Sequence, residues 1–386
     1  MIPYGRQDID QADIDAVVAI LRSDLITQGP MVPLFEQSLT SYCGASHAVV
    51  VSNASAALHI ACLALDLGPG DWLWTSPNTF VASANCALHC GAQVDFVDID
   101  PRTYNMSTEH LKEKLVRAKK DGMLPKVVVP VHLGGQSCDM LAIHLLSQQY
   151  GFKVIEDASH AIGGRYKNEP IGSCRYSDIT VFSFHPVKII TTGEGGVALT
   201  NDSQLAERMQ LFRSHGITSD RNKMGKRPTD EIWNYQQIDL GFNYRMTDIQ
   251  AALGVNQMTR LDDFVNKRHQ IAKRYNEELA GLDLRLPWQH TDSYSSYHLY
   301  PIRIKSCNTQ VNQRQVYDAF KSAGINVNLH YIPVYRQPFY EDMGFKAGYC
   351  EEAEQYHKEA LSIPIYPTLT DGDQKIVIGI LQAMCP

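Results

Sequence analysis

Short apolar runs and longer stretches with helical spacing alternate along most of the chain. Residues 9–22 place an apolar side chain every three or four positions, which predicts an amphipathic helix. The apolar run at 47–52 predicts a buried strand, and residues 54–67 predict a helix that ends at a Gly-Pro-Gly turn. The alternation then repeats, with strands predicted at 72–76, 94–97, 126–133, 153–157, 179–184 and 196–200 and helices at 79–90, 107–119 and 139–150.

This order of elements predicts an α/β fold. Short apolar strands separated by helices are typical of a doubly wound, mostly parallel sheet that is covered on both faces. Beyond a long helix predicted for 247–279, a strand at 297–304 and a helix at 311–323 indicate a smaller α+β unit. We therefore predict a large domain at 1–250, which includes the N-terminal segment, and a small C-terminal domain at 251–386.

Polar residues of the kinds used in catalysis follow five of the predicted strands. In open α/β sheets, ligands bind beyond the carboxyl ends of the strands. This edge of the sheet is therefore the predicted ligand site. The five segments are "SNAS" (52–55), "SPNTF" (76–80), "HLGGQ" (132–136), "EDASH" (156–160) and "SFHPVK" (183–188).

Two of these segments carry residues suited to a pyridine aldehyde. Asp157 follows an apolar strand and is expected at the mouth of the sheet, where a carboxylate out of bulk water needs a cationic partner. A protonated pyridine nitrogen would be such a partner, and the aspartate would keep the ring an electron sink. Lys188 could form a Schiff base with an aldehyde, as in pyridoxal phosphate (PLP) enzymes.

Other strand-end residues could complete a PLP site. Ala54 and Ser55 begin the first helix after a strand, where backbone N–H groups bind phosphate, and the hydroxyl of Ser183 could assist them. Phe80 could cover one face of the ring by stacking. Plainer structural roles stay open at this point, such as a surface position for Lys188, a core position for Phe80 and a helix-capping role for Asp157.

Composition limits the classes of partner. The chain has 386 residues and a net charge of −7, which argues against nucleic acids and anionic membranes. No stretch approaches the ~20 apolar residues that cross a bilayer. Its start, "MIPYGRQDID", lacks the basic and apolar regions of a signal peptide, and nine scattered cysteines favour a reducing compartment. We therefore predict a cytoplasmic location.

The cluster "CALHC" contains residue types that bind zinc. Cys86, His89 and Cys90 lie close together along the chain, but a second pair of ligands is missing. We predict that these residues pack a helix and that the protein holds no metal.

Four motifs carry a resemblance to a known family. The segments "EDASHAIGG", "SFHPVKIITTGEGG", "RSHGIT" and "GFNYRMTDIQAALG" resemble the DegT/DnrJ/EryC1/StrS family of PLP-dependent sugar aminotransferases. The similarity extends from "ITQGP" (26–30) to "HYIPVY" (330–335) with the motifs in the same order. It implies the fold-type-I aminotransferase architecture and transfer of an amino group to a nucleotide-linked keto sugar.

The resemblance also implies roles for individual residues. Lys188 would bind the cofactor aldehyde and move the substrate proton, Asp157 would hold the pyridine nitrogen, and His160 would lie near the phenolic oxygen. Ala54, Ser55 and Ser183 would bind phosphate, and Phe80 would stack on the ring. Asn243 would reach the phosphate of a partner subunit, which implies a homodimer with shared sites. The candidate substrate contacts are Tyr4, Thr27, Arg245, His298, His330, Tyr331 and Tyr335.

Within the family, three segments narrow the substrate. "RSHGI", "YHLYP" and "VNLHYIPVY" are most similar to the members of pseudaminic acid biosynthesis. This similarity implies transfer from L-glutamate to C4 of UDP-2-acetamido-2,6-dideoxy-β-L-arabino-hex-4-ulose. The alternative is another nucleotide-linked keto sugar, such as a D-configured UDP- or dTDP-4-keto-6-deoxy sugar or a 3-keto sugar.

Two other classes of function share features with this sequence. An NAD-dependent sugar-nucleotide oxidoreductase would need G-x-G-x-x-G after the first strand, where this chain has "SNASAA". The sequence does not exclude a PLP-binding sensor without turnover, but the retained Lys188 and the segment "HYIPVY" argue against it.

Overall fold

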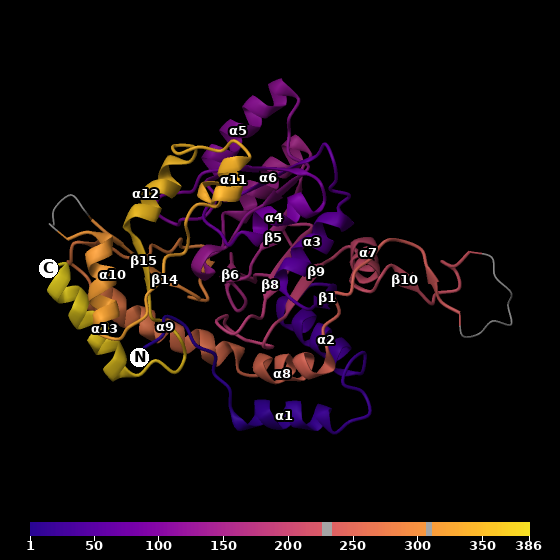
Figure 1. Ribbon diagram of the computed structural model, residues 1–386, viewed down its shortest axis with the longest axis horizontal. Coiled ribbons are helices and arrows are strands. Elements are labelled where there is room, and N and C mark those ends of the chain that lie inside the picture. Colours follow the sequence, from indigo (N-terminus) through magenta and orange to yellow (C-terminus); the bar gives the residue numbers. More distant parts are fainter. Residues whose placement is uncertain (226–233, 306–310) are drawn as a thin grey trace.

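The computed structural model describes residues 1–225, 234–305 and 311–386. Its centre is a seven-stranded sheet in the order β1-β9-β8-β5-β4-β2-β3 (Figure 1). The pairs from β8 to β3 are parallel, whereas β9 is antiparallel to both of its neighbours. The predicted α/β class with a mostly parallel sheet is confirmed. The strands are His47–Val51 (β1), Trp72–Thr75 (β2), Gln93–Phe96 (β3), Val127–Val129 (β4), Lys153–Asp157 (β5), Ile179–Ser183 (β8) and Gly196–Thr200 (β9).

Helices cover both faces of this sheet because its strands are apolar on both sides. Val49 and Val51 of β1 pack in the cluster with α3, whereas Val50 between them packs in the cluster with α2. This is the two-residue alternation of a strand. The helices around the sheet are Met31–Cys43 (α2), Ala54–Ala64 (α3), Ala82–His89 (α4), Thr108–Asp121 (α5), Met140–Tyr150 (α6), Ser203–Arg213 (α7) and Asp248–Met258 (α8).

The long helix predicted for 247–279 is wrong, because two helices occupy this stretch. α8 ends at Met258 and α9 covers Leu261–Glu278. Between them, Arg260 leaves helical geometry with φ −110° and ψ 4°, and its guanidinium binds the carboxylate of Asp13 and the carbonyl oxygen of Asp8. The apolar spacing continues across this break, so the pattern alone did not reveal it. The helices α2 and α7, and those at Pro338–Asp342 (α11), Glu351–Glu359 (α12) and Asp371–Met384 (α13), were not predicted either.

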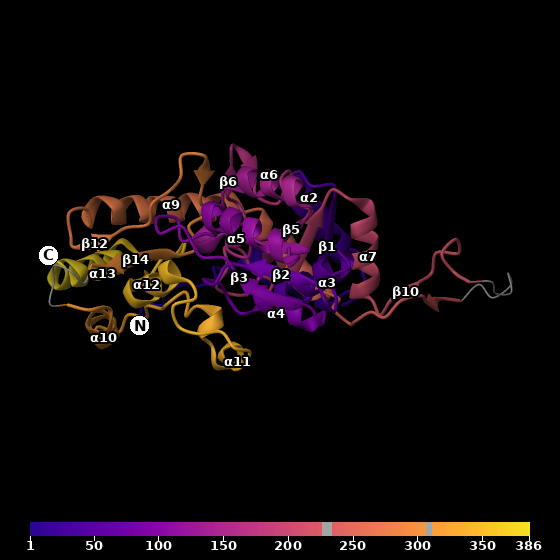
Figure 2. The same ribbon diagram turned by 90° about the horizontal axis from the view of Figure 1, so that it is seen from above.

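A second sheet, of the three strands β12, β14 and β15, lies at the end of the molecule opposite the paired strands Ile217–Thr218 (β10) and Gln236–Gln237 (β11) (Figures 1 and 2). α9 joins the two sheets, since Phe264 packs in a cluster of the large sheet and Tyr275 in the cluster of the second. The predicted boundary at residue 250 lies inside α8, and the division into two domains stays a prediction. This end contains Leu284–Arg285 (β12), Tyr300–Ile304 (β14), Ala360–Ile363 (β15), Gln313–Ser322 (α10), Glu351–Glu359 (α12) and Asp371–Met384 (α13).

The N-terminal segment runs alongside this second sheet. The backbone N–H of Ile2 donates to the carbonyl of Gly324 at 2.9 Å, and the N–H of Ile365 donates to the carbonyl of Tyr4 at 3.1 Å. These bonds bring Tyr4 toward the carboxyl edge of the large sheet. Shorter elements are Gln11–Leu21 (α1), Leu133–Gly135 (η1), Arg165–Tyr166 (β6), Glu169–Pro170 (β7), Ile217–Thr218 (β10), Gln236–Gln237 (β11), Ser293–Tyr294 (β13), Val334–Arg336 (η2) and Pro338–Asp342 (α11).

Among the described helices, none combines the length and the apolar character needed to cross a bilayer. The eight cysteines in the described ranges are all free thiols, and the ninth, Cys307, lies outside those ranges. In the "CALHC" segment the thiol of Cys86 donates to the carbonyl of Ser83 at 3.3 Å, and Cys90 caps α4. No group of three His, Cys, Asp or Glu side chains in the described part of the chain is arranged to hold a metal ion.

Candidate active site

A cavity of about 840 Å³ opens at the carboxyl edge of the large sheet. Residues from four of the five predicted strand-end segments line it, and "HLGGQ" (132–136) is the exception. Residues 328–332, which lie beside the second sheet, form the opposite wall of the cavity. The predicted site residues on its wall are Tyr4, Ala54, Ser55, Phe80, Asp157, His160, Ser183, Lys188, His330 and Tyr331.

Lys188 lies in the turn that follows β8. Its backbone N–H donates to the carbonyl of His185 at 2.9 Å, and its side chain is half-buried in the cavity wall. Burial lowers the pKa of Lys188 to about 8, although the negative charge of Asp157 acts in the opposite direction. An amine with this pKa is partly neutral near neutral pH, so it can attack a carbonyl.

Asp157 is the last residue of β5 and its side chain is only 5% exposed. Its Oδ2 accepts a hydrogen bond of 2.5 Å from the hydroxyl of Ser83, and its Oδ1 accepts one of 3.1 Å from the N–H of Ser159. The carboxylate thus has two protein donors and still faces the cavity. Because β6 is the next element along the chain, the helix-capping reading of Asp157 is wrong.

The N-terminus of α3 forms a second corner of the cavity. The side chain of Asn53 caps the helix by accepting from the N–H of Ala56 at 2.8 Å. The first N–H groups of a helix have no intrahelical acceptor, so those of Ala54 and Ser55 remain for a ligand. Opposite them, a Cβ at Gly196 would lie 2.6 Å from the nitrogen of Ala54, so a side chain there would obstruct this corner. The corner suits a phosphate group.

Phe80 forms an apolar wall of the same cavity. It stands between β2 and α4 and is 60% exposed, so the alternative of a core position is wrong. An aromatic ring left open at a cavity can stack on a flat ligand ring. Its position is compatible with the predicted platform for a cofactor ring.

A group of neutral imidazoles lies behind the Lys188 side of the cavity. Nδ1 of His160 accepts from the N–H of Gly134 at 3.3 Å, so its proton resides on Nε2, which lies 3.3 Å from the hydroxyl of Tyr331. Burial, together with the charge of Lys188, lowers the pKa of His160 well below its usual range. His298 packs against His160 with ring centroids 4.4 Å apart.

The N-terminal segment supplies part of the opposite wall. The rings of Tyr4 and His330 lie 5.2 Å apart, and Nδ1 of His330 is 2.9 Å from the hydroxyl of Ser362. Burial and the charge of Lys188 lower the pKa of His330 to about 3, so this imidazole is neutral as well. This wall offers hydrogen-bonding groups without net charge.

Two predicted substrate contacts do not reach the cavity in the described structure. Tyr335 is fully buried, and its hydroxyl donates to the carboxylate of Glu354 at 2.8 Å. Its ring packs against Phe96 in the core, so the predicted substrate contact is wrong. His298 is also buried, and its ring packs against His160 outside the lining of the cavity, so its predicted role as a substrate contact stays a prediction.

Three more predicted residues lie outside the lining of this cavity. Thr27 is exposed and pairs with Thr247, and Asn243 is exposed and pairs with Ser214. Arg245 is half-buried beside them. The N–H of Ser52 donates to the carbonyl of Tyr244 at 2.8 Å, which places the segment of Asn243 and Arg245 next to the α3 corner. Their roles stay predictions.

Sequence reasoning missed several residues on the wall. Asn53 has a recognisable signal, since an asparagine directly before an apolar helix is a typical N-cap. Asn328 and Glu194 carry no such signal, because only the fold brings them to the cavity.

The groups on the cavity wall complement one another chemically. An amine of lowered pKa and a buried carboxylate share a cavity with a helix N-terminus and an open aromatic ring. A planar aldehyde with a phosphate and a basic ring nitrogen fits these groups, since each finds a partner of suitable chemistry. The residues present therefore fit PLP.

Known proteins share the sequence and the fold of this chain. The sequence profile of the DegT/DnrJ/EryC1/StrS aminotransferase family matches residues 7–382. The UDP-4-amino-4,6-dideoxy-N-acetyl-beta-L-altrosamine transaminase of Campylobacter jejuni is 37% identical over 378 residues, with 98% of this chain and 96% of that protein covered. The spore coat polysaccharide biosynthesis protein SpsC of Bacillus subtilis is 37% identical over 382 residues, with 98% and 95% covered. The structure of Helicobacter pylori PseC, an aminotransferase involved in the biosynthesis of pseudoaminic acid, gives a TM-score of 0.89 at 29% identity, with 99% and 98% covered.

Proposed function

The chain belongs to the DegT/DnrJ/EryC1/StrS aminotransferase family, and from this membership we propose that it transfers an amino group from L-glutamate to C4 of UDP-2-acetamido-2,6-dideoxy-β-L-arabino-hex-4-ulose. The protein is a PLP-dependent sugar aminotransferase. The observation that carries the chemistry is the amine of Lys188 with its lowered pKa in one cavity with Asp157. The names of the Campylobacter and Helicobacter relatives support the substrate.

Lys188 does the covalent and proton-transfer work in this proposal. When bound, PLP supplies an aldehyde that carries the amino group and a ring that accepts electron density. The amine of Lys188 holds this aldehyde between turnovers and carries a proton to or from the reacting carbon during them. Its lowered pKa suits both tasks, because the amine changes protonation state near neutral pH.

Other residues of the cavity bind and orient the cofactor. The carboxylate of Asp157 keeps the ring nitrogen protonated by accepting its N–H. The N–H groups of Ala54 and Ser55, together with the hydroxyl of Ser183, bind the phosphate. Phe80 excludes water from one face of the ring.

The wall formed by the N-terminal and C-terminal segments would bind the sugar. Tyr4, Asn328 and Tyr331 offer hydroxyl and amide groups, which match the hydroxyl and acetamido groups of the sugar. Burial raises the pKa of Tyr331, so its phenol keeps its proton as a hydrogen-bond donor. A wall of neutral groups is suited to a sugar ring, which carries no charge of its own.

We also propose that the active form is a cytoplasmic homodimer in which Asn243 completes the partner's phosphate site. Exposed apolar side chains near this segment support an interface, because they would otherwise face water. Leu240 is 73% exposed and Tyr235 is 63% exposed, and Ile238 between them is exposed too.

Product analysis tests the substrate. The protein is incubated with L-glutamate and the UDP-linked 4-keto sugar, and NMR of the product identifies the position and configuration of the new amine. We expect the new amine at C4, with the configuration of the altrosamine that the name of the Campylobacter relative gives. The UDP- and dTDP-linked D-configured 4-keto sugars and a 3-keto sugar serve as competitors. Turnover of one of these alone would replace the proposed substrate and leave the enzyme class intact.

The half-reaction with the donor tests turnover itself. L-Glutamate alone should convert the bound cofactor to its amine form, with a change in its absorption spectrum. An unchanged spectrum with every amino acid tried would favour the alternative of a sensor that binds PLP without turnover.

A further inference from the structure

Two buried hydroxyl groups lead away from the carboxylate of Asp157. Thr79 follows β2 and Ser83 lies in the first turn of α4. Both side chains are buried, at 3% and 0% exposure. The hydroxyl oxygens of Thr79 and Ser83 lie 2.7 Å apart, and that of Ser83 lies 2.5 Å from Oδ2 of Asp157.

The donor and the acceptor in each of these two hydrogen bonds can be assigned. An ionised carboxylate only accepts hydrogen bonds, so Ser83 gives its one hydroxyl hydrogen to Asp157. The oxygen of Ser83 is then free to accept, and Thr79 donates to it. Consecutive hydrogen bonds of this kind polarise one another, so Thr79 strengthens the bond between Ser83 and Asp157.

We propose that Ser83 and Thr79 are positioning residues for the amino transfer, which act by holding the carboxylate of Asp157 in the orientation in which it accepts from the ring nitrogen. The inference rests on the proposed contact between Asp157 and the cofactor ring. Ser83 fixes Oδ2 from the side of α4, and the N–H of Ser159 fixes Oδ1 at 3.1 Å. With both oxygens anchored, the carboxylate plane cannot rotate without losing a bond.

The protein offers a matched contact for comparison. On the same strand, Oε1 of Glu156 accepts from the hydroxyl of Ser177 at 2.5 Å, the distance of the Ser83 bond. Neighbouring side chains of a strand point to opposite faces of the sheet, so this contact lies away from the cavity. Loss of either hydroxyl should lower the stability of the protein by a similar amount. Only the hydroxyl of Ser83, however, contacts Asp157, the proposed partner of the cofactor ring.

Three variants and one reference test the inference. Ser83→Ala, Thr79→Val and Ser177→Ala are compared with Asp157→Asn. The affinity of each apoprotein for PLP is measured by equilibrium ultrafiltration. The chemical shift of ¹⁵N in the ring of labelled PLP reports the protonation of its nitrogen. Steady-state kinetics with glutamate separates kcat from KM, and thermal unfolding of the apoproteins reports stability.

Ser83→Ala should weaken PLP binding about tenfold, since a hydrogen bond to a charged group is lost. The ¹⁵N shift should move toward that of the unprotonated ring, and kcat should fall with KM for glutamate nearly unchanged. Thr79→Val keeps the volume and should show the same changes at about a third of that size. Ser177→Ala should lower the unfolding temperature as Ser83→Ala does, with affinity and ¹⁵N shift unchanged.

The reference separates this inference from the proposed function. If Asp157→Asn changes affinity and ¹⁵N shift while Ser83→Ala matches Ser177→Ala, the hydrogen bonds of Ser83 and Thr79 are only structural and the inference is overturned. If Asp157→Asn leaves both unchanged, the proposed contact of Asp157 with the cofactor fails. Should Ser83→Ala not fold, Thr79→Val alone decides, because unchanged ¹⁵N shift and affinity in that variant overturn the inference.

Discussion

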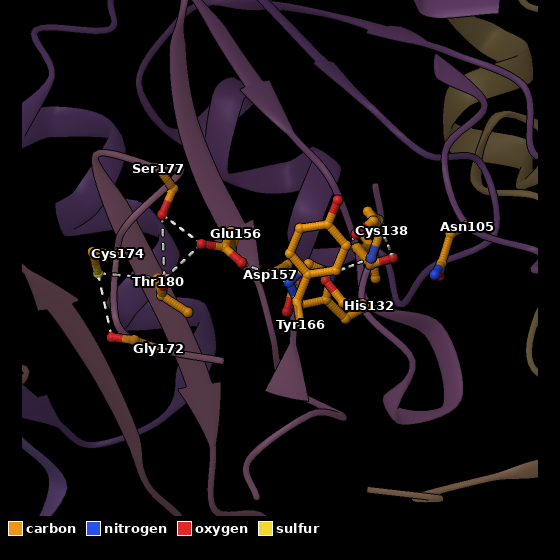
Figure 3. Close-up of polar contacts among 12 residues, drawn as sticks. Asn105, His132, Cys138, Glu156, Asp157, Tyr166, Gly172, Cys174, Ser177 and Thr180 are labelled. Atoms are coloured by element: carbon orange, nitrogen blue, oxygen red, sulfur yellow. Dashed lines mark hydrogen bonds and ion pairs between the residues drawn. The ribbon is translucent and has the colours of Figure 1, made fainter. Parts of the chain in front are cut away.

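Two neighbouring carboxylates at the end of β5 have different surroundings. Figure 3 shows Glu156 with hydrogen bonds to Ser177 and Thr180, at 2.5 Å and 3.0 Å. Its other oxygen lies 2.7 Å from Nε2 of His132. Asp157, one residue further, has one hydroxyl donor and one backbone donor and faces the cavity.

Glu156 has hydrogen-bond partners from the protein on both oxygens, whereas Asp157 can accept a further hydrogen bond from a ligand in the cavity. Burial raises the pKa of Glu156, but the hydrogen bonds from His132, Ser177 and Thr180 more than offset this and lower it overall. Nδ1 of His132 accepts from the N–H of Cys138 at 3.1 Å, so its Nε2 is the donor to Glu156. With all its partners in the protein, Glu156 holds strands together. Asp157 shares the cavity with the amine of Lys188 and can take a further donor from a ligand.

Removal of the amine should have the largest effect on the cavity side. Lys188→Ala should lower the transamination rate by at least about 10³-fold, since both the covalent anchor and the proton carrier are lost. PLP should still bind through its phosphate, but borohydride reduction should no longer attach it to the chain. Mass spectrometry of the reduced protein checks this. A reduced adduct in the variant would show that another amine is the anchor.

The two carboxylates should respond in opposite ways to neutral substitution. Asp157→Asn should reduce kcat about 10²-fold to 10³-fold, because the ring nitrogen loses a charged partner, with little change in stability. In Glu156→Gln, the single remaining acceptor oxygen cannot serve His132 on one side and Ser177 and Thr180 on the other, so the free energy of unfolding should fall by about 2 kcal/mol. Its kcat should stay near that of the parent well below the unfolding temperature. Chemical denaturation and steady-state rates measure both. A large loss of kcat in Glu156→Gln at unchanged stability would contradict the division into two roles.

The pH dependence of cofactor capture sharpens the same contrast. Burial lowers the pKa of Lys188 to about 8, so the neutral amine increases with pH up to that value and then levels off. The rate at which the apoprotein captures PLP covalently should therefore rise about tenfold per pH unit below this point. Asp157→Asn removes a negative charge that raises this pKa, so the midpoint should move to lower pH. Stopped-flow absorbance measures the rates, and Glu156→Gln should leave the midpoint unchanged. A rise that continues to about pH 10 would indicate an ordinary, solvated lysine.

The sequence predicted the amine and the carboxylate that share the cavity, but few of the residues that support them. Lys188 and Asp157 were predicted because apolar strands with polar ends define one edge of an α/β sheet, and that rule depends on local pattern alone. Ser83 was not predicted, because its contact joins positions 74 residues apart and no local spacing encodes it. Tyr335 was misjudged for the same reason, since Glu354 and Phe96 reach it only in the folded chain.

The smallest expected effect concerns the two asparagine caps, which extend the comparison from carboxylates to helix ends. Asn53 caps α3 inside the cavity with a bond of 2.8 Å, and Asn312 caps α10 outside it with a bond of 3.0 Å. Replacement of either by alanine should lower the free energy of unfolding by about 1 kcal/mol, since each helix loses one N-cap. Only Asn53→Ala should also change the affinity of the apoprotein for PLP, by about twofold to fivefold, because the first turn of α3 carries the N–H groups for phosphate. Equal PLP affinities for Asn53→Ala and Asn312→Ala would mean that the phosphate does not bind at α3, and the proposed orientation of the cofactor between Asp157 and this helix would be wrong.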